Sequence, residues 1–291
     1  MIQAIEKRMA PHTAGDPIPG LKWTRKTTQK ISRELRRAGL RVSENTVARL
    51  LRQLGYSLRV NQKKLARTCS REGRDRQFRY IQAMRRSFER RGLPIVSVDT
   101  KKKELVGRFK NSGAAWTKSP ILVNDHDFRS DARGLAVPYG VFDLRANRGF
   151  VQVGLSYDTA AFSTDALAGW FGREARHRYS NPAHRLVLAD NGGSNGSRSW
   201  LWKHFLQTKF CNRFDCAVTV CHYPPGTSKW NPIEHRLFSA ISRNWAAQPL
   251  ETVETLLKYI RTTKTSTGLR ATATLNRRKY SKGLKVSTDD R

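Results

Sequence analysis

Apolar residues in the first third of the chain recur at helical spacing. Ile31 and Leu35 lie on one face of a short segment that ends before Gly39. Val47 belongs to the apolar face of a second segment, which starts after Ser43. Two short helices joined by a glycine-containing turn are typical of a helix-turn-helix. We therefore predict a small all-α module here.

Two further segments flank this module. Residues 1–23 contain Pro and Gly without a clear apolar period, and we expect a leader or linker there. The module itself then occupies residues 24–69. Residues 70–92 form one long basic amphipathic pattern, with Ile81 and Phe88 in its apolar stripe. We expect this segment to be a helix that connects the module to the rest of the chain.

From residue 93 the pattern changes to short apolar runs separated by amphipathic segments. The predicted strands are "LPIVSVD", "GLAVPYGVFDL", "GFVQVGLSYD", "HRLVLAD" and "CAVTVCH", and a helix is expected after each of the last three. The order β-β-β-α-β-α-β-α favours a mixed α/β sheet with helices on both faces. We assign this domain to residues 93–261. Residues 262–291 are expected to be a basic C-terminal tail.

The charge balance adds a partner to this picture. The 291 residues carry 55 Lys and Arg against 23 Asp and Glu, a net charge of +32, and more than half of the excess lies in residues 1–94. Such an excess favours a polyanion, and we expect double-stranded DNA. No apolar run reaches the roughly 18 residues of a membrane span, and no signal-peptide pattern opens the chain. We predict a cytoplasmic, nucleoid-associated protein without a membrane partner.

Polar residues at the start of the second predicted helix would reach base edges, and arginines around both helices would reach phosphates. The candidates in this module are Arg33, Arg36, Arg37, Arg41, Asn45, Thr46 and Arg49. The same arginines would also suit the solvated face of any small helical domain. The strongly basic character of the segment favours DNA.

Acidic residues stand where three predicted elements begin or end. Two buried strands end in Asp99 and Asp190. Glu234 follows a stiff Pro/Gly turn and lies in the first turn of a helix, with Asn231 as the expected N-cap and Pro232 as the first helical residue. Strand ends are where sites in α/β sheets gather, and carboxylates suit Mg²⁺. Three such carboxylates could hold two ions for an in-line phosphoryl displacement.

The acids also have ordinary structural explanations. Asp99 and Asp190 would each serve as turn residues that bond to the backbone following them. Asp143 and Asp158 also follow predicted strands, and by position alone they compete for the same site. Spacing by itself therefore leaves the identity of the site acids open.

Longer motifs carry a resemblance to a known family. "VSVDTKKKELVGRFKN", "NDHDF", "PYGVFDL", "LADNGGSNGSR" and "VCHYPPGTSKWNPIEHRLFSAISRNW" resemble the ISAzo-like (Rhodopirellula-type) bacterial insertion-sequence transposases. The last of these segments is also similar to mariner-type transposases. The resemblance covers nearly the whole chain and implies a DDE transposase with a ribonuclease H-like catalytic domain. It makes Asp99, Asp190 and Glu234 the catalytic acids, which would bind two Mg²⁺ or Mn²⁺ ions.

The resemblance also implies a substrate and an assembly. The enzyme would cut DNA at the ends of an insertion sequence and join the freed 3′ ends to target DNA, which suggests a homo-oligomer that pairs two ends. Family members are longer on both sides, so we expect a shortened copy. Two alternatives stay open: a truncated, inactive copy that only binds DNA, and a simple metal-dependent nuclease.

Basic residues beside the predicted acids are further candidates. Lys101 and Lys102 follow the first aspartate, and Lys229 lies shortly before the glutamate. We expect these lysines to contact DNA phosphates, although a lysine run is more commonly a solvated face. His222 and His235 flank the same region and could also contact phosphate, although a core or surface role is more common.

The cysteines do not form a recognisable zinc motif. Cys211, Cys216 and Cys221 lack the close C-x2-C pairs of structural zinc sites. Cys216 and Cys221 would also face opposite sides of one strand. The sequence leaves the role of these three residues open.

Overall fold

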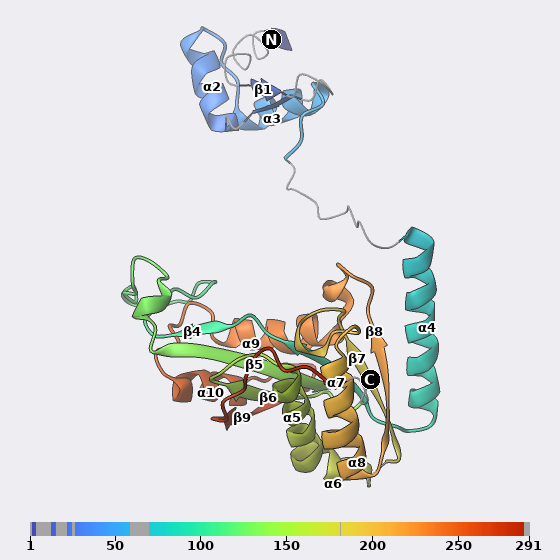
Figure 1. Ribbon diagram of the computed structural model, residues 1–291. Helices are drawn as coiled ribbons and strands as arrows, with labels where there is room; N and C mark the ends of the chain where they lie inside the picture. Colours follow the sequence, from blue (N-terminus) through green and yellow to red (C-terminus); the bar gives the residue numbers. More distant parts are fainter. Residues whose placement is uncertain are drawn as a thin grey trace. The chain divides into compact units, whose positions relative to one another are not determined.

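The computed structural model describes residues 2–3, 13–15, 22–24, 27–58, 70–180 and 182–287. The chain divides into two compact units, residues 1–65 and residues 66–291, and each is described by itself (Figure 1). No helix within these described ranges is long and apolar enough to cross a membrane.

The first unit combines a small strand pair with two helices. β1 (Thr13–Gly15) and β2 (Lys22–Thr24) pair in antiparallel fashion. Helices α2 (Thr28–Arg37) and α3 (Glu44–Gln53) follow. The leader predicted over residues 1–23 therefore contains strand segments, which are too short to show a period of two in the sequence. Most of the remaining leader lies outside the described residues.

Helices α2 and α3 pack on each other through the faces that the sequence predicts. Their shared core consists of Ile31, Leu35, Val42, Val47 and Leu50. Ser43 is the N-cap of α3, and its Oγ accepts a 3.2 Å hydrogen bond from the N–H of Thr46. Gly39 has a φ of +82°, a left-handed conformation that ends α2 at little cost.

The second unit is built on a seven-stranded mixed sheet. Its strands are β3 (Ile95–Thr100), β4 (Glu104–Val106), β5 (Gly134–Asp143), β6 (Arg148–Gly154), β7 (His184–Ala189), β8 (Ala217–His222) and β9 (Arg270–Asn276). The order is β8-β7-β3-β5-β6-β9, and β4 pairs with β5. β5 is antiparallel to both β3 and β6, whereas β7 runs parallel to β3 and β8 parallel to β7. This is the predicted mixed sheet.

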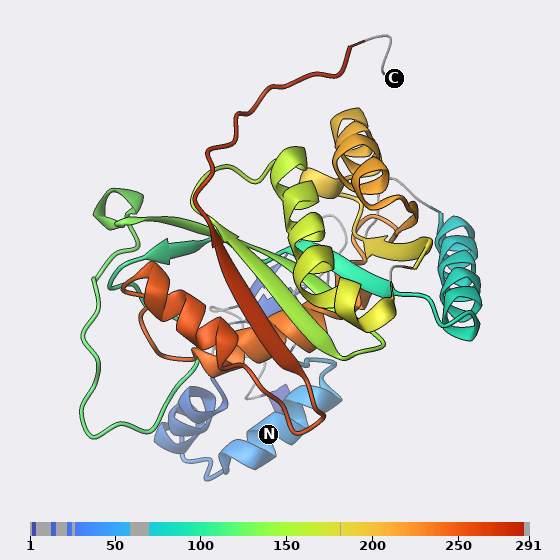
Figure 2. The same cartoon turned by 90° about the horizontal axis from the view of Figure 1, so that it is seen from below.

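Helices cover both faces of this sheet (Figures 1 and 2). The longer α-helices are α4 (Arg71–Arg90), α5 (Ala160–Trp170) and α10 (Val253–Arg261), and the shorter ones are α6 (Arg176–Tyr179), α7 (Trp200–Phe205), α8 (Asn212–Phe214) and α9 (Ser239–Asn244). Three π-helical turns continue these helices: η3 (Phe171–Ala175), η5 (Leu206–Cys211) and η7 (Glu234–Phe238). Three 3₁₀ turns lie in loops: η2 (Arg129–Asp131), η4 (Gly193–Asn195) and η6 (Ser228–Trp230).

Alternate residues of the central strands point to opposite helical layers. Val96 and Val98 of β3 share a buried cluster with residues of α5 and α7. Ile95, on the other face, packs with α4, and Phe142 of β5 packs with η7, α9 and α10. This alternation is what a strand buried on both faces requires.

Helix α4 belongs to the sheet unit. Ile81 and Phe88 of its predicted apolar stripe pack against Ile95 of β3 and Leu186 of β7. The helix predicted over residues 70–92 is therefore present, but it covers the sheet instead of only connecting two parts.

The C-terminal boundary of the predicted domain is corrected by β9. This strand pairs in parallel with β6, in a register that runs from Arg148↔Arg270 to Gly154↔Asn276. Ala271 is buried among residues of the α10 layer. The segment predicted as a tail over residues 262–291 thus supplies an edge strand. Its sequence, RATATLN, has small side chains and little apolar contrast, so the strand becomes visible only through its pairing with β6.

Candidate active site

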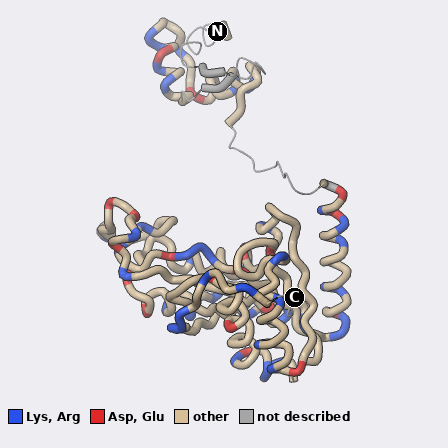
Figure 3. The backbone as a smooth tube through the Cα atoms, viewed as in Figure 1, with Lys and Arg blue, Asp and Glu red and all other residues tan. Residues whose placement is uncertain are grey.

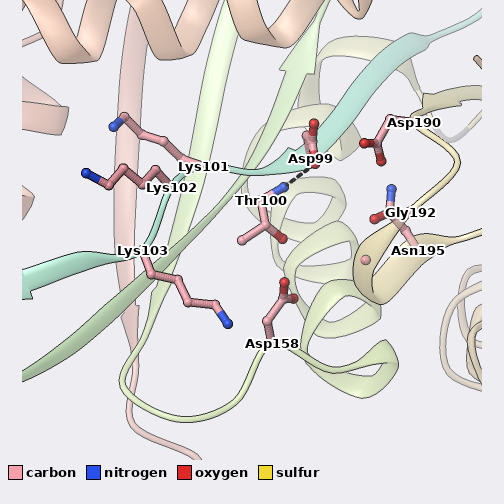
Figure 4. Close-up of a pocket in the computed structure, with 10 residues that line it drawn as sticks. Asp99, Thr100, Lys101, Lys102, Lys103, Asp158, Asp190, Gly192 and Asn195 are labelled. Carbon is pink, nitrogen blue, oxygen red and sulfur yellow. Dashed lines mark hydrogen bonds between the residues drawn. The ribbon is translucent and has the colours of Figure 1, made fainter. Parts of the chain in front are cut away.

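Asp99, near the end of β3, and Asp190, directly after β7, lie side by side on neighbouring strands. Val98 of β3 pairs with Ala189 of β7 in parallel register, so the next residue of each chain segment is an aspartate at the same end of the sheet. In Figure 4 the two carboxylates face one another. The strand pairing thus brings together two acids that are far apart in the sequence.

Buried hydrogen bonds hold the start of the helical segment that carries Glu234 against β3. The Ser97 hydroxyl donates to Oδ1 of Asn231 and accepts the N–H of Ile233 at 3.0 Å. Asn231 Nδ2 donates to the carbonyl of Val98 at 3.3 Å. The Asn231 side chain, predicted as an N-cap, therefore bonds to the sheet instead of the helix backbone. This positions the helix start against the strand that bears the first aspartate.

A glycine in β5 lets the same helix approach the sheet closely. A Cβ on Gly140 would lie 2.6 Å from a ring atom of Phe238 and 2.7 Å from Ile233. Gly140 is also the residue of β5 that pairs with Asp99. Between Ile233 and Phe238 the helix takes a π-helical turn, a feature frequent at functional sites. Glycine is therefore required directly beside the candidate site.

Burial and like charge raise the pKa of Asp99 to about 8. After burial, the charge of Asp190 contributes most to the rise, and Glu234 adds to it through its charge and a side-chain hydrogen bond. The N–H of Thr100, 2.7 Å from Oδ1 of Asp99, opposes the rise. Burial likewise raises the pKa of Asp190, against a hydrogen bond from the N–H of Gly192. The predicted turn bonds exist, and the three acids also share one environment.

A cavity of about 270 Å³ opens beside the two aspartates. Its lining includes Thr100, Asp158 and Asn195 in addition to Asp99 and Asp190 (Figure 4). Figure 4 shows the carboxylate of Asp158 directed toward the cavity from the segment before α5. A space of this size holds several water molecules or a phosphate group.

Nearly the whole chain, residues 4–291, matches one family of proteins, described as Rhodopirellula transposase DDE domain. The chain belongs to this family. It is a DDE transposase, an enzyme that cuts and joins DNA by phosphoryl transfer. The resemblance drawn from the sequence motifs is thereby confirmed. No curated protein matches the chain.

Solved structures with some similarity to this DDE transposase are complexes of the Mos1 transposase. A Mos1 paired-end complex with the left transposon end is 15% identical, covers 89% of this chain and 69% of its own, and has a TM-score of 0.48. A pre-cleavage Mos1 transpososome is 15% identical, covers 89% and 68%, and has a TM-score of 0.49. A mariner Mos1 paired-end complex with Mg has the same identity and coverage, with a TM-score of 0.48.

The acids of this DDE transposase fit a divalent cation in an open site. Among the described residues, no three His, Cys, Asp or Glu side chains are placed so as to hold an ion by themselves. Mg²⁺ does not require such a cage, because it takes one or two carboxylates together with waters and phosphate oxygens. Asp99, Asp190 and Glu234 offer the oxygen ligands that a hard cation prefers, and a buried, unpartnered Oδ1 of Asp158 belongs to the same cavity.

The lysines near the DDE transposase site differ in their availability. Lys101 is buried, with its ammonium 2.6 Å from Glu104 and 4.6 Å from the centroid of the Trp245 ring. This pairing corrects the prediction that Lys101 contacts DNA. Lys102 and Lys229 are exposed, as a phosphate contact requires. Their role in DNA binding stays a prediction.

Asp143, one of the competing acids, has a structural role. Its two carboxylate oxygens accept hydrogen bonds from the Tyr179 hydroxyl at 2.8 and 2.9 Å. Arg178 lies 3.3 Å away, and the N–H groups of Arg145 and Ala146 bond to Oδ1. Because every side of this fully buried carboxylate is partnered, it has no oxygen left for a ligand.

The residues predicted to contact DNA lie on α2, on α3 and in the turn between them. Those with exposed side chains are Arg33, Arg36, Arg37, Arg41, Asn45 and Arg49. Thr46 is half-buried, and its hydroxyl lies 3.0 Å from the Oγ of Ser43 in the cap of α3. Figure 3 shows basic positions along α2 and also along α4. Their contact with DNA remains to be tested.

The cysteines pack into different layers of the DDE transposase. Cys211 and Cys216 lie close together in the α5–α8 layer, whereas Cys221 packs against the α4 layer. Cys216, directly before β8, and Cys221 within it therefore lie on opposite sides of the sheet, as predicted. Burial, reinforced by Cys216, raises the pKa of the Cys211 thiol to about 11, so it is a thiol at neutral pH. Cys69 lies outside the described residues.

Sequence reasoning missed the residues that join the acids together. Ser97 interrupts the apolar strand IVSVD, and a polar residue buried in such a run needs a partner, so its role carried a signal. Asn195 stands in a glycine-rich turn, and nothing in the local sequence marks it as 1% exposed. Its backbone carbonyl accepts a hydrogen bond from Nε2 of His222 at 2.9 Å.

Proposed function

We propose that Asp99, Asp190 and Glu234 are the catalytic acids of this DDE transposase, and that it acts on the ends of its own insertion sequence. The observation that carries this proposal is the meeting of three carboxylates from β3, the end of β7 and η7, where burial and then the charges of Asp190 and Glu234 raise the pKa of Asp99. A structural role alone would not place Asp190 and Glu234 beside the half-buried Asp99, because their charges disfavour its ionisation.

Two divalent cations, Mg²⁺ or Mn²⁺, would be held by these acids. When bound, they supply charge that stabilises the attacking and leaving oxygens of a phosphoryl displacement. The chain itself contributes position: the hydrogen bonds of Ser97 and Asn231 hold the start of η7 against β3. Asp99 must give up its proton to serve as a ligand, so the site favours metal more strongly as the pH rises toward 8.

DNA would be bound by both units of the chain. The exposed arginines of α2 and α3 supply phosphate contacts, and Asn45 lies at the start of α3, where a recognition helix reads bases. Lys102 and Lys103 are exposed residues in the lining of the acidic cavity, and they are suited to neutralise the phosphates of a strand placed there. Because two element ends must be brought together, the active form is proposed to be a homo-oligomer.

A cleavage assay tests the proposal directly. Supercoiled plasmid carrying the gene's flanking DNA is incubated with the full chain and Mg²⁺ or Mn²⁺. We expect cleavage at the element ends for the wild type, and a loss of at least about 100-fold in Asp99→Asn and Glu234→Gln, because each substitution removes a carboxylate that would hold the cations. Asp127→Asn is the matched control, since it removes an exposed carboxylate outside the cavity.

Three results would contradict the proposal. Cleavage that persists in both acid variants would show that Asp99 and Glu234 are not needed for the reaction. If neither the wild type nor any variant cleaves the plasmid but the protein still shifts DNA in a gel, the protein binds DNA without cutting it. Cleavage without joined products would indicate a simple nuclease.

A further inference from the structure

Asp158 places a fourth carboxylate at the candidate active site. It follows β6 and directly precedes the N-cap of α5, and it lines the same cavity as Asp99 and Asp190 (Figure 4). Its Oδ1 is buried and has no hydrogen-bond partner among the described residues. Its charge, with those of the two aspartates, also bears on the buried phenol of Tyr139.

An unpartnered buried carboxylate oxygen is costly unless a ligand completes it. The same sheet shows the contrast, because the buried Asp143 has every oxygen bonded by protein groups. Asp158 is not needed as a helix cap either, since Thr159 already accepts the N–H of Phe162 at 3.3 Å. Lys103 lines the cavity as well, but within the described chain it forms no ion pair with Asp158.

A second side chain independently indicates a ligand in this cavity. Asn195 is 1% exposed, lines the cavity, and its Nδ2 has no hydrogen-bond partner among the described residues. The hydroxyl of Thr100 is buried and equally unpartnered. An amide donor and a hydroxyl suit the oxygens of a phosphodiester, whereas the carboxylate of Asp158 suits a cation or its bound water. The unpartnered groups therefore match a cation and phosphate bound together.

We propose that Asp158 is a fourth acidic group of this site, which contacts, through a bound water, the divalent cation held by Asp99 and Asp190, while Asn195 donates to an oxygen of the DNA phosphate. This inference rests on the proposed function, because it concerns the same cavity. It assigns the cation to a group that lies outside the three-acid pattern of the sequence motifs.

Mn²⁺ binding to the full chain tests the assignment without relying on catalysis. Isothermal titration with Mn²⁺, in the absence of DNA, compares the wild type with Asp158→Asn and the charge-matched control Asp127→Asn. We expect Asp158→Asn to weaken Mn²⁺ binding by about tenfold or more, as loss of a group near a metal typically does. Asp127→Asn should bind as the wild type does, and Asp158→Glu, which keeps the carboxylate, should bind more tightly than Asp158→Asn.

A stability measurement in EDTA separates a ligand from a structural residue. Without metal, Asp158→Asn should unfold at the same temperature as the wild type or higher, because it removes a repelling charge with an unpartnered oxygen. A lower unfolding temperature in EDTA would make Asp158 structural and overturn the assignment. Wild-type Mn²⁺ affinity in Asp158→Asn would overturn it as well.

The proposed function fails in a different way. Asp99→Asn serves as the reference in the same titration, because both proposals require it to lose Mn²⁺ affinity. Weak binding in Asp99→Asn with unchanged binding in Asp158→Asn rejects only the role of Asp158. Unchanged binding in Asp99→Asn would reject the metal site of the proposed function and the further assignment with it.

Discussion

At the scale of single residues, the partners of each acid decide its role. Asp143 and Asp158 both follow strands, and their sequence surroundings do not separate them. In the structure, Tyr179 and Arg178 complete the carboxylate of Asp143, whereas Oδ1 of Asp158 is left without a partner in the described chain. Those partners come from α6, which lies more than 30 residues further along the chain, so a local sequence pattern cannot predict their contact with Asp143.

The proton held by Asp99 predicts a dependence of stability on pH. Its pKa in the folded chain is about 8, above the ordinary 3.8, so the folded metal-free protein keeps a proton that the unfolded chain has lost. The free energy of unfolding should therefore fall as the pH rises from about 4 to about 8. Asp99→Asn should flatten this part of the profile. Urea unfolding at several pH values, in EDTA, measures the effect.

Asp127→Asn serves as the control in this series, because its carboxylate is exposed. It should retain the slope of the wild type. An Asp99→Asn profile with an unchanged slope would contradict the assignment of the proton to this group of acids. Added Mg²⁺ should oppose the wild-type decline, because metal binding becomes easier once the proton has left.

At the scale of elements, the site depends on how closely η7 and α9 lie on the sheet. Ser97 and Asn231 tie the start of this helical segment to β3, and Gly140 leaves room for Ile233 and Phe238. The hydrogen bonds of Ser97 and Asn231 fix the orientation of this helical segment, and Gly140 allows the segment to lie close to the sheet. Both are needed because a carboxylate moved by about 1 Å is no longer in a productive position.

Gly140→Ala is predicted to push this helical segment away from the sheet. The added methyl would meet the Phe238 ring at 2.6 Å in a packed core, and such overpacking costs about 1–3 kcal/mol of unfolding free energy. Mn²⁺ affinity should fall with it, because Glu234 lies in the displaced segment. Urea unfolding and Mn²⁺ titration on the same samples measure the two effects.

Gly134→Ala, in the same strand, is the matched control. A Cβ at Gly134 has no atom within 4 Å, so stability should change by less than about 0.5 kcal/mol. Equal effects of the two substitutions would show that close packing beneath η7 does not matter.

At the scale of the whole molecule, charge and architecture point to the same polymer. The chain carries a net charge of +32, and the first unit presents exposed arginines on two packed helices. The second unit carries a cavity lined by three aspartates and three lysines at the end of a largely buried sheet. The carboxylates repel the phosphates of DNA until cations bind to them. The exposed basic residues therefore have to attract the DNA to the protein.

Replacing Arg36, Arg41 and Arg49 together by Gln should weaken DNA binding by the full chain. For every phosphate that the protein no longer neutralises, the slope of log affinity against log salt becomes shallower by about 0.9. Gel shifts or fluorescence anisotropy at several salt concentrations, in EDTA to prevent cleavage, measure the slope. A triple variant of the exposed Arg173, Arg213 and Arg243, all in the second unit, provides the comparison.

An equally shallow slope in the two triple variants would contradict a special role for α2 and α3. A change confined to the variant of Arg36, Arg41 and Arg49 would support it. Because both variants remove the same total charge, net charge alone cannot produce a difference between them.

Local sequence patterns predicted most strands of the sheet and the two aspartates at strand ends. Apolar periodicity is a local property, since backbone geometry repeats every two or 3.6 residues. It therefore predicted strands in LPIVSVD and HRLVLAD, which are observed at residues 95–100 and 184–189, and the helical pair of the first unit. The family resemblance added the pairing of these acids with Glu234.

The tertiary structure decided which groups meet. The register of β3 with β7 placed Asp99 beside Asp190, and the contact of β9 with β6 turned a predicted tail into an edge strand. Burial paired Lys101 with Glu104 and left Asp158 facing the cavity. The two strand pairings join residues distant in sequence, which no local period encodes, because strand register is fixed by packing across the sheet.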